Sequence, residues 1–422
     1  MGFIFALCAI LAPAACTSVV GTFQRIEPKA LDITYLYYSS LDFMAAVEAS
    51  GKSEKITNGR VTVFTQPETR KLAGEIAGAA DRSYRAAAEG TGIQWIYSSE
   101  LYLLAVPQIP AQIEFNARKE KGIMAVGVFA TPSDQTPADV ARSNPFFPQV
   151  WAHEMTESAM VLAGKGRTVF VNDPCLGGLG WTMGTRWFRE GVSNCAAYFV
   201  LREMAGPDAP PDGELSRPFS SLGLVRDKLF KWNQCHGPKG FDGLNAGDLY
   251  AAAFGLLLEL RERNGADAVA RLTASFGPSA TVDGDAILSA MRRLFAFDAR
   301  EFARDYRYPF LGVELVPEWP KGERMKVKTV IEGTPAAKGG IKPGDVFEGI
   351  NGRPVYNAWK MEWALRDAPV GREMALDVRR EGKIVRLTIT PCEFTLAISR
   401  PAGRQTPPPM RSGIAASVRP VY

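Results

Sequence analysis

The chain has 422 residues, which is more than one hydrophobic core usually holds, so two or more domains are expected. Its composition is ordinary for a globular protein, and 49 Lys and Arg stand against 45 Asp and Glu. Because this small basic excess is spread along the chain, nucleic acid is not expected as a partner.

The first residues, 1–16, form an apolar run that ends in Ala12-Pro13-Ala14-Ala15-Cys16. This pattern is typical of a secretory signal, and the run is too short to span a bilayer comfortably. Ala14-Ala15-Cys16 also resembles a bacterial lipobox, although Pro13 stands where Leu is usual and no Lys or Arg precedes the run. Ordinary cleavage after Ala14 and a wrongly assigned start codon are the alternatives. We expect an exported protein, in the periplasm or held at the outer membrane by a lipid on Cys16.

Four cysteines remain after this signal, and none belongs to a CxxC pair: Cys175, Cys195, Cys235 and Cys392. Neither a zinc ribbon nor a thioredoxin-type site is therefore indicated. In an oxidising compartment some of them can be bridged, but the spacing does not tell which.

The segment 17–60 is mixed in character, and we assign it no role. Val61–Phe64 is predicted to be a strand, and apolar residues then recur at helical spacing up to Gly90. Two strand-like runs follow, Leu101–Val106 and Ile123–Phe129. Helices are predicted at Trp151–Ala163, Trp187–Arg202 and Asp248–Arg263, with surface loops between them. The block 61–305 is therefore expected to form one α+β domain.

The first of these helices carries His153-Glu154-Met155-Thr156-Glu157. Positions four apart lie on one face of a helix, so His153 and Glu157 can point at one metal ion while Glu154 points to its side. In HExxH enzymes two histidines bind zinc, a third ligand comes from elsewhere, and the first Glu is the general base. Glu157 replaces the second histidine here, and a carboxylate is also a zinc ligand.

Two further motifs follow in the order found in the gluzincin metallopeptidases, which this sequence resembles. Trp187-Phe188-Arg189-Glu190-Gly191 matches the family motif W-x-x-E-G, and Tyr250-Ala251-Ala252-Ala253 occupies the place of its Y-x-K-G-A segment. The resemblance implies a zincin-like metallopeptidase domain with one zinc ion. His153 and Glu190 would be metal ligands, Glu157 a substitute ligand, Glu154 the general base and Tyr250 the donor to the oxyanion.

The resemblance also places the substrate-pairing edge strand of the family at Ile123–Phe129. Gly122-Ile123-Met124-Ala125 lacks the acid that captures a free amino terminus, which favours an endopeptidase over an aminopeptidase. One His and two carboxylates carry a formal charge equal and opposite to that of zinc. Water on such a site is expected to be less acidified than on a two-His, one-Glu site, or a harder metal to be preferred.

Each of these residues also has an ordinary structural interpretation. An HExxE pattern on a helix is often a solvated face, Glu190 by itself would be a surface residue, and Tyr250 is equally explained as a core aromatic. His236, the other histidine, is not expected to be a ligand because the gluzincin pattern has none at its place.

The C-terminal region, 308–395, contains four turn-rich segments that resemble the PDZ domains of bacterial envelope proteases. They are Tyr308–Val313, Gly333–Ala337, Gly340–Val346 and Ile350–Val355. Gly and Pro mark turns between short Val- and Ile-rich strands, and Asn351-Gly352 is a strong hairpin signal. A PDZ domain after a peptidase makes the sequence similar to the glycyl aminopeptidase branch. The implied fold of this region is a partly open β-barrel with helices.

PDZ domains bind an extended peptide as an added strand, with the loop before the second strand holding the terminal carboxylate. That loop and strand correspond to Phe310, Leu311, Gly312 and Val313, and the groove helix to Asn357–Arg366. The alternative is a PDZ domain that only packs on the catalytic domain. Residues 396–422 are expected to be a flexible, basic, Pro-containing tail.

These patterns together predict a zinc-dependent peptidase of the cell envelope that cleaves proteins or peptides, with a PDZ domain that recruits them. The alternative, from another functional class, is a catalytically inactive pseudopeptidase that acts as a PDZ-based peptide-binding adaptor. Glu157 in place of histidine is the feature that separates the two.

Overall fold

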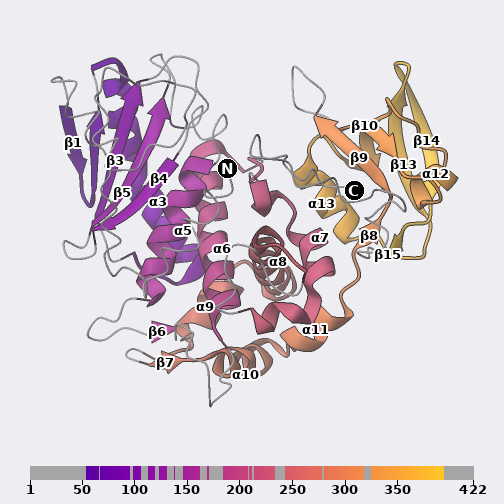
Figure 1. Ribbon diagram of the computed structural model, residues 1–422. Helices are drawn as coiled ribbons and strands as arrows, with labels where there is room; N and C mark the ends of the chain where they lie inside the picture. The colour runs from indigo at the N-terminus through magenta and orange to yellow at the C-terminus, as the bar shows by residue number, and fades with distance from the viewer. Residues whose placement is uncertain are drawn as a thin grey trace, which may run out of the picture.

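The computed structural model describes residues 54–65, 67–95, 98–105, 113–118, 123–130, 137, 146–161, 169–170, 184–207, 209–211, 213–232, 243–277, 280–317 and 325–393. The predicted signal with Cys16, the predicted tail, Cys175, Cys235 and His236 lie outside these residues. Within them the chain forms an N-terminal sheet, a layer of helices and a C-terminal sheet (Figure 1). The mixture of helix and sheet agrees with the predicted class.

The N-terminal sheet has the strand order β1-β2-β3-β5-β4. Its strands are β1 (Glu54–Asn58), β2 (Val61–Thr65), β3 (Ser98–Ala105), β4 (Ile113–Arg118) and β5 (Ile123–Ala130). β2, β3 and β5 are parallel, and β1 and β4 are antiparallel edges. Val61, Val63 and Thr65 are buried because alternate side chains of β2 share one face, and α3 (Arg70–Thr91) packs against β1 and β2. The sheet thus begins at Glu54, inside the segment that was given no role.

The predicted identity of the edge strand is wrong. β5 is paired along both sides, with β3 from Ser98↔Ile123 onward and with β4 from Arg118↔Ile123 onward. The edge is β4, with the sequence IEFNAR, which includes the acid Glu114. The apolar pattern of a strand reports the burial of its faces and does not tell which strands pair with its sides. The lack of an acid at 122–125 therefore no longer favours an endopeptidase.

The layer of helices lies between the two sheets (Figure 1). The three predicted helices are α5 (Phe146–Val161), α6 (Arg186–Ala205) and α8 (Ala246–Asn264). Several shorter elements were not predicted: α7 (Pro218–Val225), α9 (Ala268–Ala274), α10 (Gly284–Phe295), α11 (Ala299–Asp305), the 3₁₀ segments η2 (Pro67–Thr69), η4 (Gly213–Ser216) and η5 (Arg226–Lys231), and the strands β6 (Val169–Phe170) and β7 (Thr281–Val282).

α6 and α8 cross in close contact at Gly191, directly after Glu190. A Cβ atom on Gly191 would lie 2.8 Å from the backbone oxygen of Ala253, so a larger residue would push the two helices apart. The glycine of the W-x-x-E-G motif therefore has a packing role. It allows the start of α6, with Glu190, to lie beside Tyr250 near the start of α8.

The C-terminal sheet has the order β14-β13-β11-β10-β9, with β12 added to β11. The strands are β9 (Val313–Pro317), β10 (Met325–Val330), β11 (Val346–Ile350), β12 (Arg353–Pro354), β13 (Met374–Arg380) and β14 (Lys383–Ile389). β8 (Pro309–Phe310) pairs with β15 (Cys392–Glu393), and the helices are α12 (Pro335–Lys338) and α13 (Ala358–Arg366). β9 and β14 are the two edges of this sheet, so the barrel is open between them in the described part of the chain.

α13, the predicted groove helix, packs on the layer of helices through aromatic side chains. The ring of Trp359 lies 5.3 Å from that of Tyr198 in α6 and 6.2 Å from that of Phe254 in α8. Trp363, one turn later, lies 4.8 Å from Phe219 in α7. We call this contact, together with the polar groups below, the α13 interface.

Polar contacts of the α13 interface involve two further residues on the same face of α13. Glu362 is fully buried and accepts hydrogen bonds from Phe219 N at 3.1 Å, Ser220 N at 3.0 Å and Ser220 Oγ at 2.7 Å. It thereby caps the N-terminus of α7 with a side chain from another domain. Arg366 donates to both carboxylate oxygens of Glu259 in α8, at 2.5 and 2.9 Å. The C-terminal domain is therefore firmly docked on the helices.

The two described cysteines, Cys195 and Cys392, are both free of disulfide bonds. Among the described residues, no helix combines the length and the apolar character needed to cross a bilayer.

Candidate metal centre

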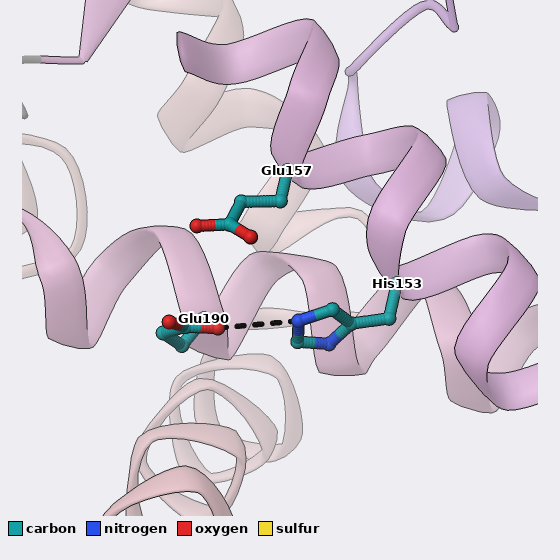
Figure 2. A group of neighbouring side chains, drawn as sticks. All are labelled: His153, Glu157 and Glu190. Carbon is teal, nitrogen blue, oxygen red and sulfur yellow. Dashed lines mark ion pairs between the residues drawn. The ribbon is translucent and has the colours of Figure 1, made fainter. Parts of the chain in front are cut away.

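α5 is held against the N-terminal sheet by one face, which leaves another face for the site. Trp151 Nε1 donates to Ser99 Oγ of β3 at 2.9 Å, and Met155, four residues later, is fully buried beside the same hydroxyl. His153 and Glu157 are also four residues apart and so share a different face of the helix. That face is turned toward α6 (Figure 2).

His153 and Glu157 of α5 and Glu190 of α6 converge (Figure 2). One ligand atom from each of them lies within 4.8 Å of the other two. His153 Nε2 is 3.2 Å from Glu190 Oε2, and the two side chains are 15% and 5% exposed. In the part of the chain that the structure describes, no other three His, Cys, Asp or Glu side chains meet in this way.

The imidazole of His153 is oriented by Asn194, a residue that belongs to none of the sequence motifs. Asn194 Oδ1 accepts from His153 Nδ1 at 2.7 Å, and Asn194 Nδ2 donates to the backbone oxygen of Tyr250 at 3.1 Å. This arrangement leaves His153 Nε2 directed at Glu190. The sequence did contain one indication of this role: Asn194 follows Glu190 by four residues and therefore lies on the same face of the helix.

Two arginines of α6 also belong to the site and were not predicted to. Arg189 is fully buried, and its Nη1 is 3.2 Å from Glu157 Oε1. Arg186 Nε is 3.4 Å from Glu190 Oε1, and its Nη2 donates to the hydroxyl of Tyr250 at 3.2 Å. Arginine is seldom buried unless it is paired, so neither residue looks like a core position in the sequence.

The acids Glu154, Glu157 and Glu190 change the pKa of His153 and of one another. Burial is the largest influence on the pKa of His153 and lowers it, but the contact with Glu190 and the charges of Glu154 and Glu157 together raise that pKa to about 10. The pKa of Glu154 is raised to about 8 by burial and by the charges of Glu157 and Glu190, against the effect of His153. The pKa of Glu190 is lowered instead, because His153 and the two arginines outweigh burial.

Tyr250 lies beside the predicted ligands. Its ring is 6.2 Å from the imidazole of His153 and 5.0 Å from the ring of Trp232. Burial above all, and then the charge of Glu190, raise the pKa of Tyr250 well above its ordinary value. The hydroxyl is therefore protonated at neutral pH and can donate a hydrogen bond.

The residues present fit a zinc ion. Two atoms bound to a tetrahedral zinc at about 2.0–2.1 Å lie about 3.3 Å apart. The 3.2 Å between His153 Nε2 and Glu190 Oε2 matches that spacing. Glu190 Oε2 is buried, and its contact among the described residues is the 3.2 Å ion pair with His153 Nε2, which a cation bound between these two atoms would replace. One imidazole and two carboxylates form a donor set that zinc accepts.

The predicted peptide-binding loop of the C-terminal domain lies between β8 and β9. Gly312 has φ +87°, and a Cβ atom on it would lie 2.3 Å from the side chain of Thr334, so glycine is required there. The carbonyls of Leu311 and Gly312 accept from Ala336 N and Ile331 N, both at 2.8 Å. The N–H groups of Leu311 and Gly312 make no hydrogen bond within the described part of the chain.

Comparisons with known proteins establish the family of the C-terminal region, because residues 309–390 match the PDZ domain family. The chain is 30% identical over 92 residues to the magnetosome formation protease MamE of Magnetospirillum gryphiswaldense, covering 20% of this chain and 12% of that protein. It is 32% identical over 85 residues to the periplasmic serine endoprotease DegP of Escherichia coli, covering 19% and 18%. The chain thus matches less than a fifth of the length of either relative.

Two solved structures are among those to which the chain is similar. The HtrA3 PDZ domain bound to a phage-derived ligand covers 20% of this chain and 86% of that one, at 24% identity and a TM-score of 0.19. An aminopeptidase N family protein from Idiomarina loihiensis covers 81% of this chain and 67% of that one, at 12% identity and a TM-score of 0.40. At these values neither likeness establishes an activity, so the function of the N-terminal domain depends on its own site.

Proposed function

We propose that this chain, with its C-terminal PDZ domain, is a metal-dependent peptidase of the cell envelope. The observation that carries the proposal is the convergence of His153, Glu157 and Glu190 beside Glu154 and Tyr250. A single cation held there would lie next to a carboxylate suited to proton transfer and a hydroxyl suited to hydrogen-bond donation. These are the groups that peptide hydrolysis needs.

Some of these side chains would bind the metal ion, and others would take part in the reaction. His153, Glu157 and Glu190 would hold one zinc ion, which supplies Lewis acidity when bound. Asn194 keeps the imidazole of His153 in the orientation that presents Nε2. Glu154 would take a proton from the attacking water, and the hydroxyl of Tyr250 would donate to the oxyanion that develops on the substrate.

The PDZ domain would deliver the substrate. β9 is an edge strand with Leu311 and Gly312 before it, which suits the addition of a peptide strand and the capture of its terminal carboxylate. The two relatives named above, which match only a short segment of this chain, are proteases, and one of them is periplasmic. Export through the signal at 1–16, with or without a lipid on Cys16, would bring the chain to the same compartment.

The proposal is tested by zinc content and by hydrolysis of an unstructured protein such as casein. Protein purified without chelator should contain zinc, and Glu154→Gln should lower the rate of hydrolysis by about 10²–10⁴-fold because an amide cannot take the proton. Glu89→Gln, an exposed change on α3, is the matched control and should keep the wild-type rate. Absence of bound metal, or full activity in Glu154→Gln, would contradict the proposal.

A second function is favoured by the two buried arginines. Arg186 and Arg189 are close enough to Glu190 and Glu157 to neutralise them without a metal, so the centre can persist as a buried ion-pair network. The chain would then be an inactive pseudopeptidase and a PDZ-based adaptor. Zinc-free protein that binds a peptide ending in a free carboxylate and does not hydrolyse casein is the result expected for this function.

A further inference from the structure

We infer that Arg189 is the residue that allows Glu157 to stand where HExxH enzymes have their second histidine. The inference rests on the proposed zinc site and assigns Arg189 as a positioning residue, which acts on the metal through Glu157. Relative to histidine, Glu157 adds a negative charge to the ligand set, and Arg189 places a buried positive charge next to that carboxylate.

The ligand charges are the first step. Two neutral histidines and one glutamate carry one negative charge, whereas His153, Glu157 and Glu190 carry two when both acids are ionised. The guanidinium of Arg189 is paired with Glu157 and offsets the charge that Glu157 adds, whereas Arg186 is paired with Glu190, the acid that both ligand sets contain. An added carboxylate by itself would weaken the Lewis acidity of a bound zinc ion, so the nearby positive charge restores what the exchange of histidine for glutamate removes.

The geometry and burial of Arg189 are the second step. Its Nη1 lies 3.2 Å from Glu157 Oε1, and the exposed fractions of the two side chains are 0% and 16%. Because the side chain of Arg189 is not exposed to solvent, water and salt screen the interaction of its charge with Glu157 and a bound cation only weakly. Arg189 directly precedes Glu190 in α6. The helix α6 therefore supplies both the ligand Glu190 and the positive charge that faces Glu157, the ligand from α5.

A counterintuitive consequence follows for the substitution Glu157→His, which recreates the HExxH motif. A neutral imidazole at position 157 would remove the carboxylate that faces Arg189 while the guanidinium stays buried near the cation. Zinc binding should therefore become weaker although the motif is restored. Removing the positive charge as well should bring the affinity back.

The experiment compares zinc dissociation constants of purified full-length proteins, measured by competition with a chromogenic chelator. Glu157→His should bind zinc about 10–100-fold more weakly than the wild type, and the double variant Glu157→His/Arg189→Gln should return to the wild-type range. Glu157→His/Arg189→Lys, which keeps the positive charge, should remain weak. Circular dichroism establishes that each variant is folded.

The matched control is Arg202→Gln, which removes a charge from the same helix about 20 Å away and should leave zinc affinity unchanged. The inference is overturned if Glu157→His binds zinc as tightly as the wild type, or if the double variant binds no more tightly than Glu157→His. A wild-type chain that binds no zinc is a different result, because it rejects the proposed function itself. If the Gln variant does not fold, the Lys variant decides: wild-type affinity in Glu157→His/Arg189→Lys would overturn the role of charge.

Discussion

The candidate metal centre and the α13 interface both bury carboxylates in or against the layer of helices, and the partners of these carboxylates differ. At the interface, Glu362 accepts three hydrogen bonds from the start of α7, and Glu259 receives two from Arg366. At the centre, the buried Oε2 of Glu190 is held by a single ion pair, with the proposed metal-ligating nitrogen Nε2 of His153 at 3.2 Å. The charge of Glu190 also contributes to raising the pKa of Glu154 and that of Glu157.

This difference separates a structural group from one that is prepared for a ligand. A buried carboxylate whose oxygens are all satisfied stabilises one arrangement of the chain and has nothing left to bind. A buried carboxylate that has acidic neighbours and is paired with the imidazole nitrogen of a potential metal ligand can exchange that pair for a bound cation. The comparison predicts that changes at the interface alter stability, whereas changes at the centre alter metal binding.

Breaking the ion pair between Arg366 and Glu259 at the interface should destabilise the protein most. Arg366→Met leaves the carboxylate of Glu259, which is only 2% exposed, without its two strongest donors. Loss of one partner from a buried pair costs about 3–5 kcal/mol, and Arg263 nearby should keep the cost at the lower end. Thermal denaturation should show a lower Tm, and limited proteolysis should release the PDZ domain.

Arg386→Met is the control for this change, because Arg386 pairs with Asp377 at an exposed position. It should leave Tm and the proteolysis pattern unchanged. An unaltered Tm in Arg366→Met, or a loss of zinc in that variant with the fold intact, would break the distinction between the two regions.

The next effect is a pH dependence of stability that originates at Glu362. Burial raises the pKa of Glu362 to about 7, against the hydrogen bonds from Ser220 and Phe219 and the charge of Arg217. The folded protein then holds this proton more tightly than the unfolded chain, so the free energy of unfolding falls as the pH rises from about 4.5 to about 7. The shift corresponds to about 3 kcal/mol over that window.

Glu362→Gln should flatten this part of the pH profile, because glutamine keeps the shape and the acceptor but does not titrate. The measurement is urea unfolding of wild type and variant at a series of pH values. A wild-type profile that does not fall across the window, or a variant profile as steep as that of the wild type, would show that Glu362 is not the group responsible.

At the metal centre, the smallest of these changes is expected in the zinc affinity, after substitution of Asn194. Asn194→Ala removes the acceptor that orients His153, and such changes typically weaken metal binding by about 10–100-fold. Asn194→Asp retains an acceptor and should bind zinc more tightly than the alanine variant. Asn264→Ala, at the far end of α8, serves as the control. Equal zinc affinity in all four proteins would rule out a positioning role for Asn194.

Features that depend on local periodicity could be predicted from the amino-acid sequence without the fold. The spacing of His153 and Glu157 places both on one helix face wherever that helix packs, and the helices that carry Glu190 and Tyr250 form where their patterns predicted. The turn signals of the PDZ region are local in the same sense, and the match over residues 309–390 confirms that domain. The signal at 1–16 and the tail remain predictions.

Tertiary structure alone decided which elements meet. The sequence indicated the strand at Ile123–Phe129 but not that β4 would cover its outer side, because pairing joins residues whose patterns carry no mark of their partners. It placed Arg189 and Asn194 on a helix but not beside Glu157 and His153. Helix periodicity acts over a few residues, whereas the burial of a charge depends on surfaces supplied by distant segments. The balance of charge at the centre therefore became visible only when α5 and α6 were seen together.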